Sequence, residues 1–322
     1  MTKSALKLAT VGALALAFAG QAMAEVKLND TFSVSGYVAG SYQYSKTAAA
    51  IATDHLDVDS SQLLFKYNSA PVTGVASVYY VPKQAPDEAT LLDAYATYDV
   101  GNGVSVTGGK FLSYLGYESF FSVNNPTISA ANGAIGVIPG YHSGVKVDYS
   151  DKEWGFGGAL LDSVYGATSL KGDGSLKSGQ GYEGYVTYKG VTDLTIFGGV
   201  AFDNQSAVTG KDIATYNIWA SYKVDAKTTV AAEFAQRDGG GRTDKGSNWL
   251  FLANYQATDK VNCAFRISGE KDMDAGTKFV KYTVAPGIAL TKDLTVRAEY
   301  SLTDARVGRD NNFFGVQAYV KF

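Results

Sequence analysis

The sequence predicts an all-β fold, namely a transmembrane antiparallel up-and-down β-barrel of about sixteen strands. Three observations predict it: strand-length segments in which apolar and polar residues alternate, a regular alternation of short turns and longer loops, and a last segment that ends on Phe322. Strand side chains point alternately to opposite faces, so each such segment has one apolar and one polar face. A closed barrel with lipid outside and water inside suits strands of this kind.

The first 24 residues are typical of a secretory signal peptide. Lys3 and Lys7 precede an apolar run, residues 8–19, and the small residues Ala22 and Ala24 then frame a cleavage site. The run is too short for a membrane-spanning helix, which needs about 20 residues. We therefore expect cleavage after residue 24, and a mature chain of residues 25–322 that forms one barrel domain.

The composition agrees with an exported barrel. Tyr (22), Phe (16) and Gly (36) are abundant, whereas Pro (6) and Met (3) are few. Subtracting the two lysines of residues 1–24 from 28 basic residues leaves 26, against 31 acidic residues, so the mature chain is acidic. No basic patch indicates a nucleic-acid partner. The single cysteine, Cys263, lies on the apolar parity of its segment and is expected to be a small buried hydrophobe.

Sixteen alternating segments follow residue 31, each close to the 9 to 11 residues with which a tilted strand crosses a bilayer. A count of twelve to sixteen is compatible with the pattern, because strand ends are difficult to place from one sequence. Short turns rich in Gly, Asn, Asp and Lys are expected at 69–72, 101–103, 151–153, 190–193, 224–227, 257–260 and 290–293. Longer loops are expected at 45–59, 82–90, 112–140, 163–180, 204–211, 238–246, 271–276 and 302–310. Short turns on one rim and long loops on the other are typical of outer-membrane barrels.

The last segment predicts the two faces of a closing strand. Its apolar parity holds Phe314, Val316, Ala318, Val320 and Phe322, and its other parity holds Gly315, Gln317, Tyr319 and Lys321. The terminal Phe322 resembles the assembly signal of bacterial outer-membrane proteins. This likeness implies that the barrel-assembly machinery is a partner, and that outer-membrane lipid and lipopolysaccharide surround the folded chain.

Several motifs along the chain resemble those of the OmpL-like β-barrel porin family. They are Leu92-Asp-Ala-Tyr-Ala-Thr-Tyr-Asp99, Gly108-Gly-Lys-Phe111, Gly116-Tyr-Glu118 and Gly140-Tyr-His-Ser-Gly144. With the two ends of the chain, the likeness covers nearly all of residues 25–322. It implies a barrel in the outer membrane of a Gram-negative bacterium with a pore role, and it assigns no catalytic residue. The likeness to general porins further implies a homotrimer.

The longest expected loop, residues 112–140, is the third long loop and mixes apolar with polar residues. Its expected pore-facing residues are Tyr114, Tyr117, Glu118, Asn124 and Asn125. We interpret the segment as a loop that folds into the barrel and narrows the channel, as the third loop of general porins does. The alternative is that its aromatic residues pack on the outer rim or at a contact between subunits.

Strand parity also selects charged residues that face the lumen. The set that we expect to line the pore is Lys66, Lys146, Glu233, Arg237, Arg266, Arg297 and Glu299. A Lys or Arg that faced lipid near the midplane would cost about 2 to 4 kcal/mol, so mid-strand Arg266 and Arg297 are the firmest of these assignments. For each residue alone, the alternative interpretation is mutual pairing inside a wet interior.

These patterns predict a passive diffusion channel for small hydrophilic solutes and ions, and no enzyme. The adjacent His142 and Ser143 point to opposite faces of a strand, so they cannot form a nucleophile and base pair. No metal site or cofactor is expected. Asp54, His55, Asp57 and Asp59 could bind a divalent cation at the cell surface, but such spacing is more often typical of a solvated acidic loop. The alternative from another class is a structural or adhesive barrel with a plugged lumen, although sixteen strands favour an open channel.

Overall fold

The computed structural model describes residues 25–47, 52–82, 89–131, 137–165, 180–204, 211–240, 245–272 and 276–322. The expected signal peptide, residues 1–24, lies outside this part of the chain. The described residues contain one 3-10 helix, η1 (Ser122–Asn124), and seventeen strands: β1 (Val26–Lys27), β2 (Phe32–Thr47), β3 (Thr53–Ser69), β4 (Val72–Tyr80), β5 (Thr90–Gly101), β6 (Val104–Leu112), β7 (Tyr141–Ser150), β8 (Trp154–Leu161), β9 (Gln180–Tyr188), β10 (Leu194–Asn204), β11 (Ile213–Lys223), β12 (Thr228–Gly239), β13 (Gly246–Gln256), β14 (Val261–Asp272), β15 (Thr277–Ala289), β16 (Leu294–Val307) and β17 (Asn311–Lys321).

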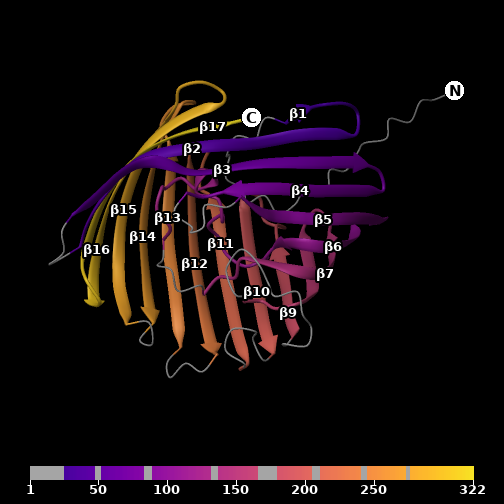
Figure 1. The fold of residues 1–322 in the computed structure, drawn as a ribbon. Helices are drawn as coiled ribbons and strands as arrows, with labels where there is room; N and C mark the ends of the chain where they lie inside the picture. Colours follow the sequence, from indigo (N-terminus) through magenta and orange to yellow (C-terminus); the bar gives the residue numbers. More distant parts are fainter. Residues whose placement is uncertain are drawn as a thin grey trace.

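Strands β2 to β17 form a closed ring. Each pairs antiparallel with the next along the chain, and the last strand, β17, pairs with β2 from Asn311↔Thr47 to Lys321↔Tyr37. In Figure 1 the yellow β17 lies beside the indigo β2, where the ring closes. The two-residue β1 pairs with β2 in addition. The predicted antiparallel barrel of sixteen strands is confirmed, with one extra short strand.

The outer and inner faces of the strands follow the predicted alternation. In β17, Phe314, Val316 and Val320 point outward with 36 to 42% of their surface exposed. Their neighbours Gln317 and Lys321 point inward, where they are 1% and 6% exposed. In a soluble protein the apolar face of a strand points to the core. Here the apolar face is the outer one, because in a membrane it contacts lipid.

The short turns lie where the sequence predicts them, and each has a local cause. Between β5 and β6, Asn102 and Gly103 have φ angles of 54° and 82°, as a two-residue hairpin with two positive φ angles requires. Between β11 and β12, the Asp225 carboxylate accepts hydrogen bonds from the backbone N–H groups of Lys227 and Thr228, both at 2.7 Å. These bonds lower the pKa of Asp225 and stabilise the turn.

Two of the expected long loops are wrong. Most of 45–59 and 302–310 is strand, because β2 ends at Thr47, β3 begins at Thr53 and β16 continues to Val307. The polar residues on both parities of the start of β3 had indicated a loop. A strand that continues beyond the bilayer meets water on both faces, so it needs no apolar face there.

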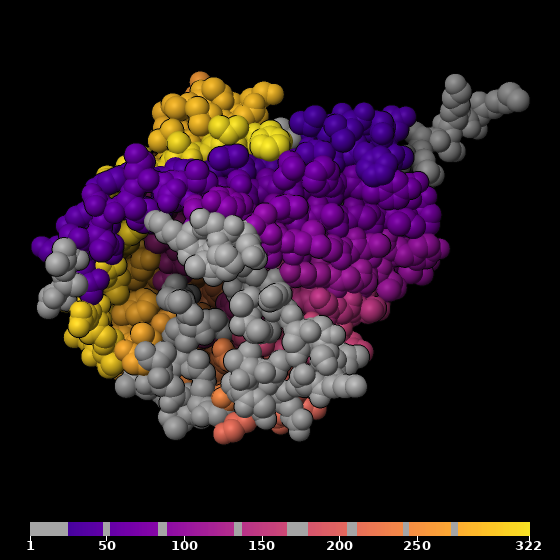
Figure 2. All heavy atoms as spheres, in the orientation of Figure 1, coloured from indigo at the N-terminus to yellow at the C-terminus, as the bar shows by residue number. Residues whose placement is uncertain are grey.

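The hydrophobic core lies inside the barrel, between the inner wall and the loop that joins β6 to β7. Each of the four buried clusters contains residues of the wall, and its packed neighbours include residues of this loop. In Figure 2 the indigo to magenta strands form a continuous outer surface, and the view passes into a hollow between them and the orange strands. No helix in the described residues is long and apolar enough to span a membrane.

Candidate functional site: the barrel interior and loop 112–140

All seven charged residues that we expected to line the pore lie on the inner parity of their strands. Cross-strand partners share a face, and each of these residues is opposite a residue of the inner wall. Lys66, for example, is opposite Ser33, and Arg266 is opposite Leu252, both of which are buried inside. The same register places the others inward, namely Lys146, Glu233, Arg237, Arg297 and Glu299.

Most of these charges are covered by protein. Arg266 and Glu299 are each 1% exposed and Arg297 is 3% exposed, whereas Lys66, Lys146 and Arg237 are half-buried. The cover comes from the described residues of loop 112–140, 112–131 and 137–140, many of which contact inward-facing side chains around the ring. The predicted entry of this loop into the barrel therefore accounts for the burial of the charges.

The loop first contacts the wall at β7 and β9. The Tyr114 hydroxyl donates to Asp148 Oδ1 at 2.8 Å, and its backbone N–H donates to Glu183 Oε2 at 3.1 Å. The ammonium of Lys146 lies 4.8 Å from the centre of the Tyr114 ring. Burial and the Asp148 carboxylate raise the pKa of Tyr114, so its hydroxyl stays a neutral donor.

An aromatic row on three adjacent strands holds the next segment. Tyr185 of β9, Phe197 of β10 and Trp219 of β11 follow one another, with the centres of Phe197 and Trp219 5.1 Å apart and their planes 6° from parallel. Loop residues cover both ends: Tyr114 lies 4.4 Å from Tyr185, and Tyr117 contacts Trp219 edge-on at 5.5 Å. Such ring pairs add about 0.5 to 1.5 kcal/mol each beyond the burial of their area.

Glu118 then pairs with Arg266 on β14, which is eight strands from β6 in a ring of sixteen. The same guanidinium donates to Thr127 Oγ1 at 2.8 Å and to the Ser129 carbonyl at 3.0 Å. The second oxygen of Glu118 accepts from the backbone N–H of Ala131 at 2.7 Å. The pair therefore joins two parts of the loop to the wall opposite its origin.

A carboxylate and a guanidinium of β16 hold the middle of the loop. Glu299 accepts the backbone N–H groups of Ile128, at 2.5 Å, and Ser129, at 3.0 Å. Arg297 donates to the carbonyl oxygens of Asn125 and of Ser122, the latter at 3.0 Å. The inner wall thus satisfies backbone groups of the loop that no strand or helix pairs.

The remaining expected constriction residues have different roles. The side-chain oxygen of Asn124 accepts from Lys321 Nζ at 3.0 Å, at the last residue of β17. The Asn125 amide bonds within the loop, accepting from the Ser119 N–H at 2.8 Å and donating to the Ser119 carbonyl at 2.9 Å. Asn124 is exposed, and Asn125 is half-buried.

Sequence reasoning missed two neutral wall residues that hold the loop. Asn217 of β11 accepts from the Gly116 N–H at 3.0 Å, and Ser268 of β14 donates to the Ala131 carbonyl at 2.5 Å. Both stand on the inner parity of their strands, which is the signal that could have identified them. Attention to charge alone passed over neutral side chains that can form hydrogen bonds.

The whole chain was compared with known proteins, and one family model matches it. The model is described as "Putative beta-barrel porin-2, OmpL-like" and matches residues 31–322. The chain belongs to this family. It is accordingly a porin-type β-barrel of the bacterial outer membrane. A comparison with individually curated proteins finds no match.

Solved outer-membrane proteins share the fold of this OmpL-like chain at low identity. They include an anion-selective porin from Comamonas acidovorans, with a TM-score of 0.69 at 11% identity over 91% of this chain and 99% of that chain. The outer-membrane channel DcaP of Acinetobacter baumannii gives a TM-score of 0.67 at 13% identity, over 90% and 97%. OmpT of Vibrio cholerae, folded in vitro and in a trimer form, gives 0.62 at 13% identity, over 91% and 100%. These likenesses show the fold alone.

The interior of this OmpL-like barrel also contains a buried histidine. His142 is fully buried and inward, with Nε2 3.7 Å from Glu183 Oε2, whereas Ser143 lies on the opposite parity beside Lys110. The expected separation of His142 and Ser143 is therefore present. Within the part of the chain that the structure describes, no three His, Cys, Asp or Glu residues are grouped so that they could hold a metal ion.

Proposed function

We propose that this protein is a passive diffusion porin for small hydrophilic solutes and ions, and that loop 112–140 narrows its lumen. The observation that carries the proposal is the path of the loop. Between Tyr114 and Asn124, the loop is hydrogen-bonded or ion-paired to inward side chains of β7, β9, β11, β12, β14, β16 and β17. A polar wall held at a fixed distance from such a loop is the arrangement that selects solutes by size and charge.

The open path that we infer runs along the wall that carries fewer loop anchors. On β3 and β5 the inward residues Lys66 and Thr97 are half-exposed and Asp99 is exposed. In this proposal, lipid and lipopolysaccharide surround the barrel, the assembly machinery receives its C-terminal strand, and three copies form the working unit.

The test is single-channel current across a planar bilayer, with a salt gradient to determine ion preference. We expect stable conducting steps from the folded protein. Deleting residues 124–134 removes the part of the loop that Arg266, Arg297 and Glu299 hold, so conductance should rise. An unchanged conductance would show that the loop does not limit the flow.

A second candidate is a barrel with a plugged lumen and a structural or adhesive role. One observation favours it: loop residues Tyr117, Val123 and Ala131 are at most 2% exposed and pack into clusters with the inner wall. A loop packed like a core can block a channel. Silence in the bilayer from protein shown to be folded would establish this second candidate.

A further inference from the structure

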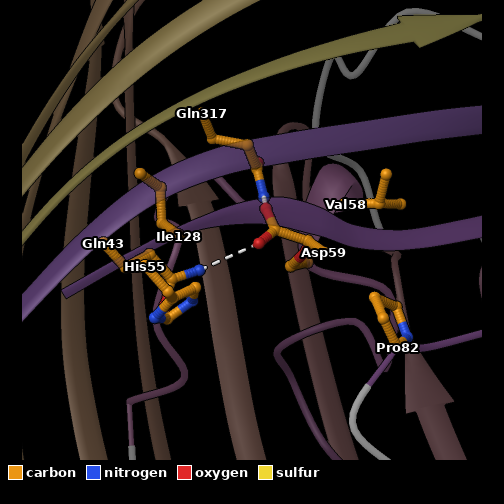
Figure 3. Close-up of a pocket in the computed structure, with 8 residues that line it drawn as sticks. Gln43, His55, Val58, Asp59, Pro82, Ile128 and Gln317 are labelled. Carbon is orange, nitrogen blue, oxygen red and sulfur yellow. Dashed lines mark hydrogen bonds between the residues drawn. The ribbon is translucent and has the colours of Figure 1, made fainter. Parts of the chain in front are cut away.

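A cavity of about 230 Å³ lies at the inner wall between loop 112–140 and the strands on which the ring closes. Strands β2, β3 and β17, the loop, and Pro82 after β4 form its walls. The lining residues are Gln43, His55, Val58, Asp59, Pro82, Ser122, Ile128 and Gln317. In the view of Figure 3, Asp59 stands between Gln43 and His55 on one side and Pro82 on the other. None of the anchors of the loop described above uses Asp59.

A β-bulge directs Asp59 into this cavity. Ala39 pairs with Ser60 and the next residue, Gly40, pairs with Val58, so Asp59 is an extra residue on β3. A bulge of this kind re-aims a side chain, and such sites recur at barrel rims and next to functional sites. The Asp59 carboxylate accepts hydrogen bonds from Ser41 at 2.6 Å, Gln43 at 3.0 Å and Gln317 at 2.6 Å.

All three of these donors are neutral, and the amide of Gln317 stands between Asp59 and the guanidinium of Arg297. Arg297 Nε donates to Gln317 Oε1 at 2.9 Å, and the Gln317 amide nitrogen donates in turn to Asp59 Oδ2. Figure 3 shows the bonds of Gln43 and Gln317 to Asp59 as dashed lines. In the described ranges, no salt bridge involves Asp59, and the cavity lining contains no Lys or Arg.

A half-buried carboxylate that hydrogen bonds orient, and that no ammonium or guanidinium contacts directly, attracts a positive ligand. Removal from bulk water strengthens the Coulomb attraction of such a group for a cation. The remaining walls set the shape of the ligand: Pro82 and Ile128 offer apolar contact, and Ser122 and His55 offer hydrogen-bonding groups. A metal ion would leave the apolar walls unused, whereas an amine with a short alkyl part would contact both kinds of surface.

We propose that this cavity binds a small organic cation, with its ammonium group on Asp59 and its alkyl part against Pro82 and Ile128. Since Ser122 and Ile128 belong to loop 112–140, the bound cation also contacts the loop. That solutes bind this site while they pass through the channel rests on the proposed porin function. Binding itself requires only the folded barrel.

The first test is isothermal titration calorimetry of the folded, detergent-solubilised protein with n-butylammonium chloride, in 0.3 M salt that screens exposed charges. Butan-1-ol, of nearly the same shape and without charge, is the ligand control. We expect saturable binding of the amine and none of the alcohol. Asp59→Asn should weaken amine binding about tenfold or more, because a charge-assisted contact is lost.

Two further variants separate charge at Asp59 from general effects. Asp59→Glu keeps the charge and should retain binding to within a few-fold. Asp99→Asn removes one carboxylate from the inner wall at the opposite rim and should leave binding unchanged. Circular dichroism confirms that each variant is folded. Equal binding by the protein and by Asp59→Asn, or equal binding of the alcohol, would overturn the proposal.

Single-channel recording distinguishes failure of this site from failure of the porin function. If the protein conducts, n-butylammonium should reduce its current, and Asp59→Asn should require about tenfold more amine for the same reduction. Conduction with no Asp59-dependent binding overturns the cation site and leaves the porin proposal in place. Asp59-dependent binding by a barrel that does not conduct supports the site and overturns the porin proposal.

Discussion

At the residue scale, the inner wall uses its charges to hold a loop. Arg266 has a side chain without solvent exposure, and its partner Glu118 has a side chain that is 14% exposed. Desolvating two charges is costly, and the cost is recovered only when both are paired and their other hydrogen-bonding groups are satisfied. The carbonyls of loop residues Ser129 and Ala130 accept from the terminal guanidinium nitrogens, whereas the buried Arg266 Nε has no hydrogen-bond partner. The pair is therefore specific to one position of the loop, although its hydrogen bonding is incomplete.

We expect Arg266→Gln to destabilise the folded protein by about 3 kcal/mol, because it leaves Glu118 with an uncompensated charge. Urea unfolding in lipid vesicles measures the change. Glu118→Gln alone should cost less, since the guanidinium keeps its bonds to Thr127 and to backbone carbonyls. Because the two residues act as a pair, the double variant should lose less than the sum of the single losses. Strictly additive losses would show that the pair does not couple.

At the element scale, each strand is defined by which of its faces meets lipid. On β14, Ile267 points outward with 42% exposure between Phe251 and Tyr282 of the neighbouring strands, while its neighbour Arg266 points inward. One position along the strand therefore separates a lipid contact from the most buried cation of the interior. Cys263 of the same strand is half-buried on the outward parity, as the alternation predicts.

Placing the same charge on the two faces tests this assignment. Ile267→Arg puts a guanidinium into lipid near the middle of the strand and should cost about 2 to 4 kcal/mol. Asn254→Arg puts it on the half-buried inner face of β13 and should cost less than 1 kcal/mol by the same unfolding measurement. Similar losses at the two positions would mean that the faces are assigned wrongly.

At the scale of the whole molecule, stability depends on closure of the ring. β17 is the strand that satisfies the edges of both β16 and β2, and an unpaired edge in lipid leaves backbone groups without partners. The chain end takes part in this closure. Gly36 N donates to the Phe322 carbonyl at 2.7 Å, the Phe322 N–H donates back at 3.0 Å, and a side chain at Gly36 would clash with the Phe322 ring.

Deleting Phe322 should therefore separate folding from cellular assembly. The eleven register pairs of β17 with β2 remain, so the purified variant should still refold in detergent with a loss of about 1 to 3 kcal/mol from the two bonds. If Phe322 has the assembly role that we propose, its loss should reduce the amount inserted into the outer membrane in cells, as measured by membrane fractionation. Normal insertion in cells would remove Phe322 from the assembly signal.

The sequence alone determined the class, a strand count of about sixteen, and the faces of residues in regular strands. These depend on local alternation with a period of two and on turn chemistry, both of which are visible in a few consecutive residues such as Asn102-Gly103. The same rule selected the seven charged residues expected to line the pore. They stand on the inner parity of their strands, and their lining of a pore stays a prediction. The pattern did not predict the loop-side ends of β2, β3 and β16. Beyond the bilayer both faces of a strand meet water, so apolar and polar residues no longer alternate there.

Only the tertiary structure decided what the inward residues do. Glu118 and Arg266 are 148 residues apart, and Asp59 and Gln317 are 258 apart, so no local pattern links them. The path of loop 112–140 across the ring decides whether a charged side chain of the inner wall is exposed or buried. Many such contacts between distant residues together fix that path. The bulge that directs Asp59 inward likewise arises from a shift in register between β2 and β3. Long-range pairing, and not local propensity, therefore forms the interior of this barrel.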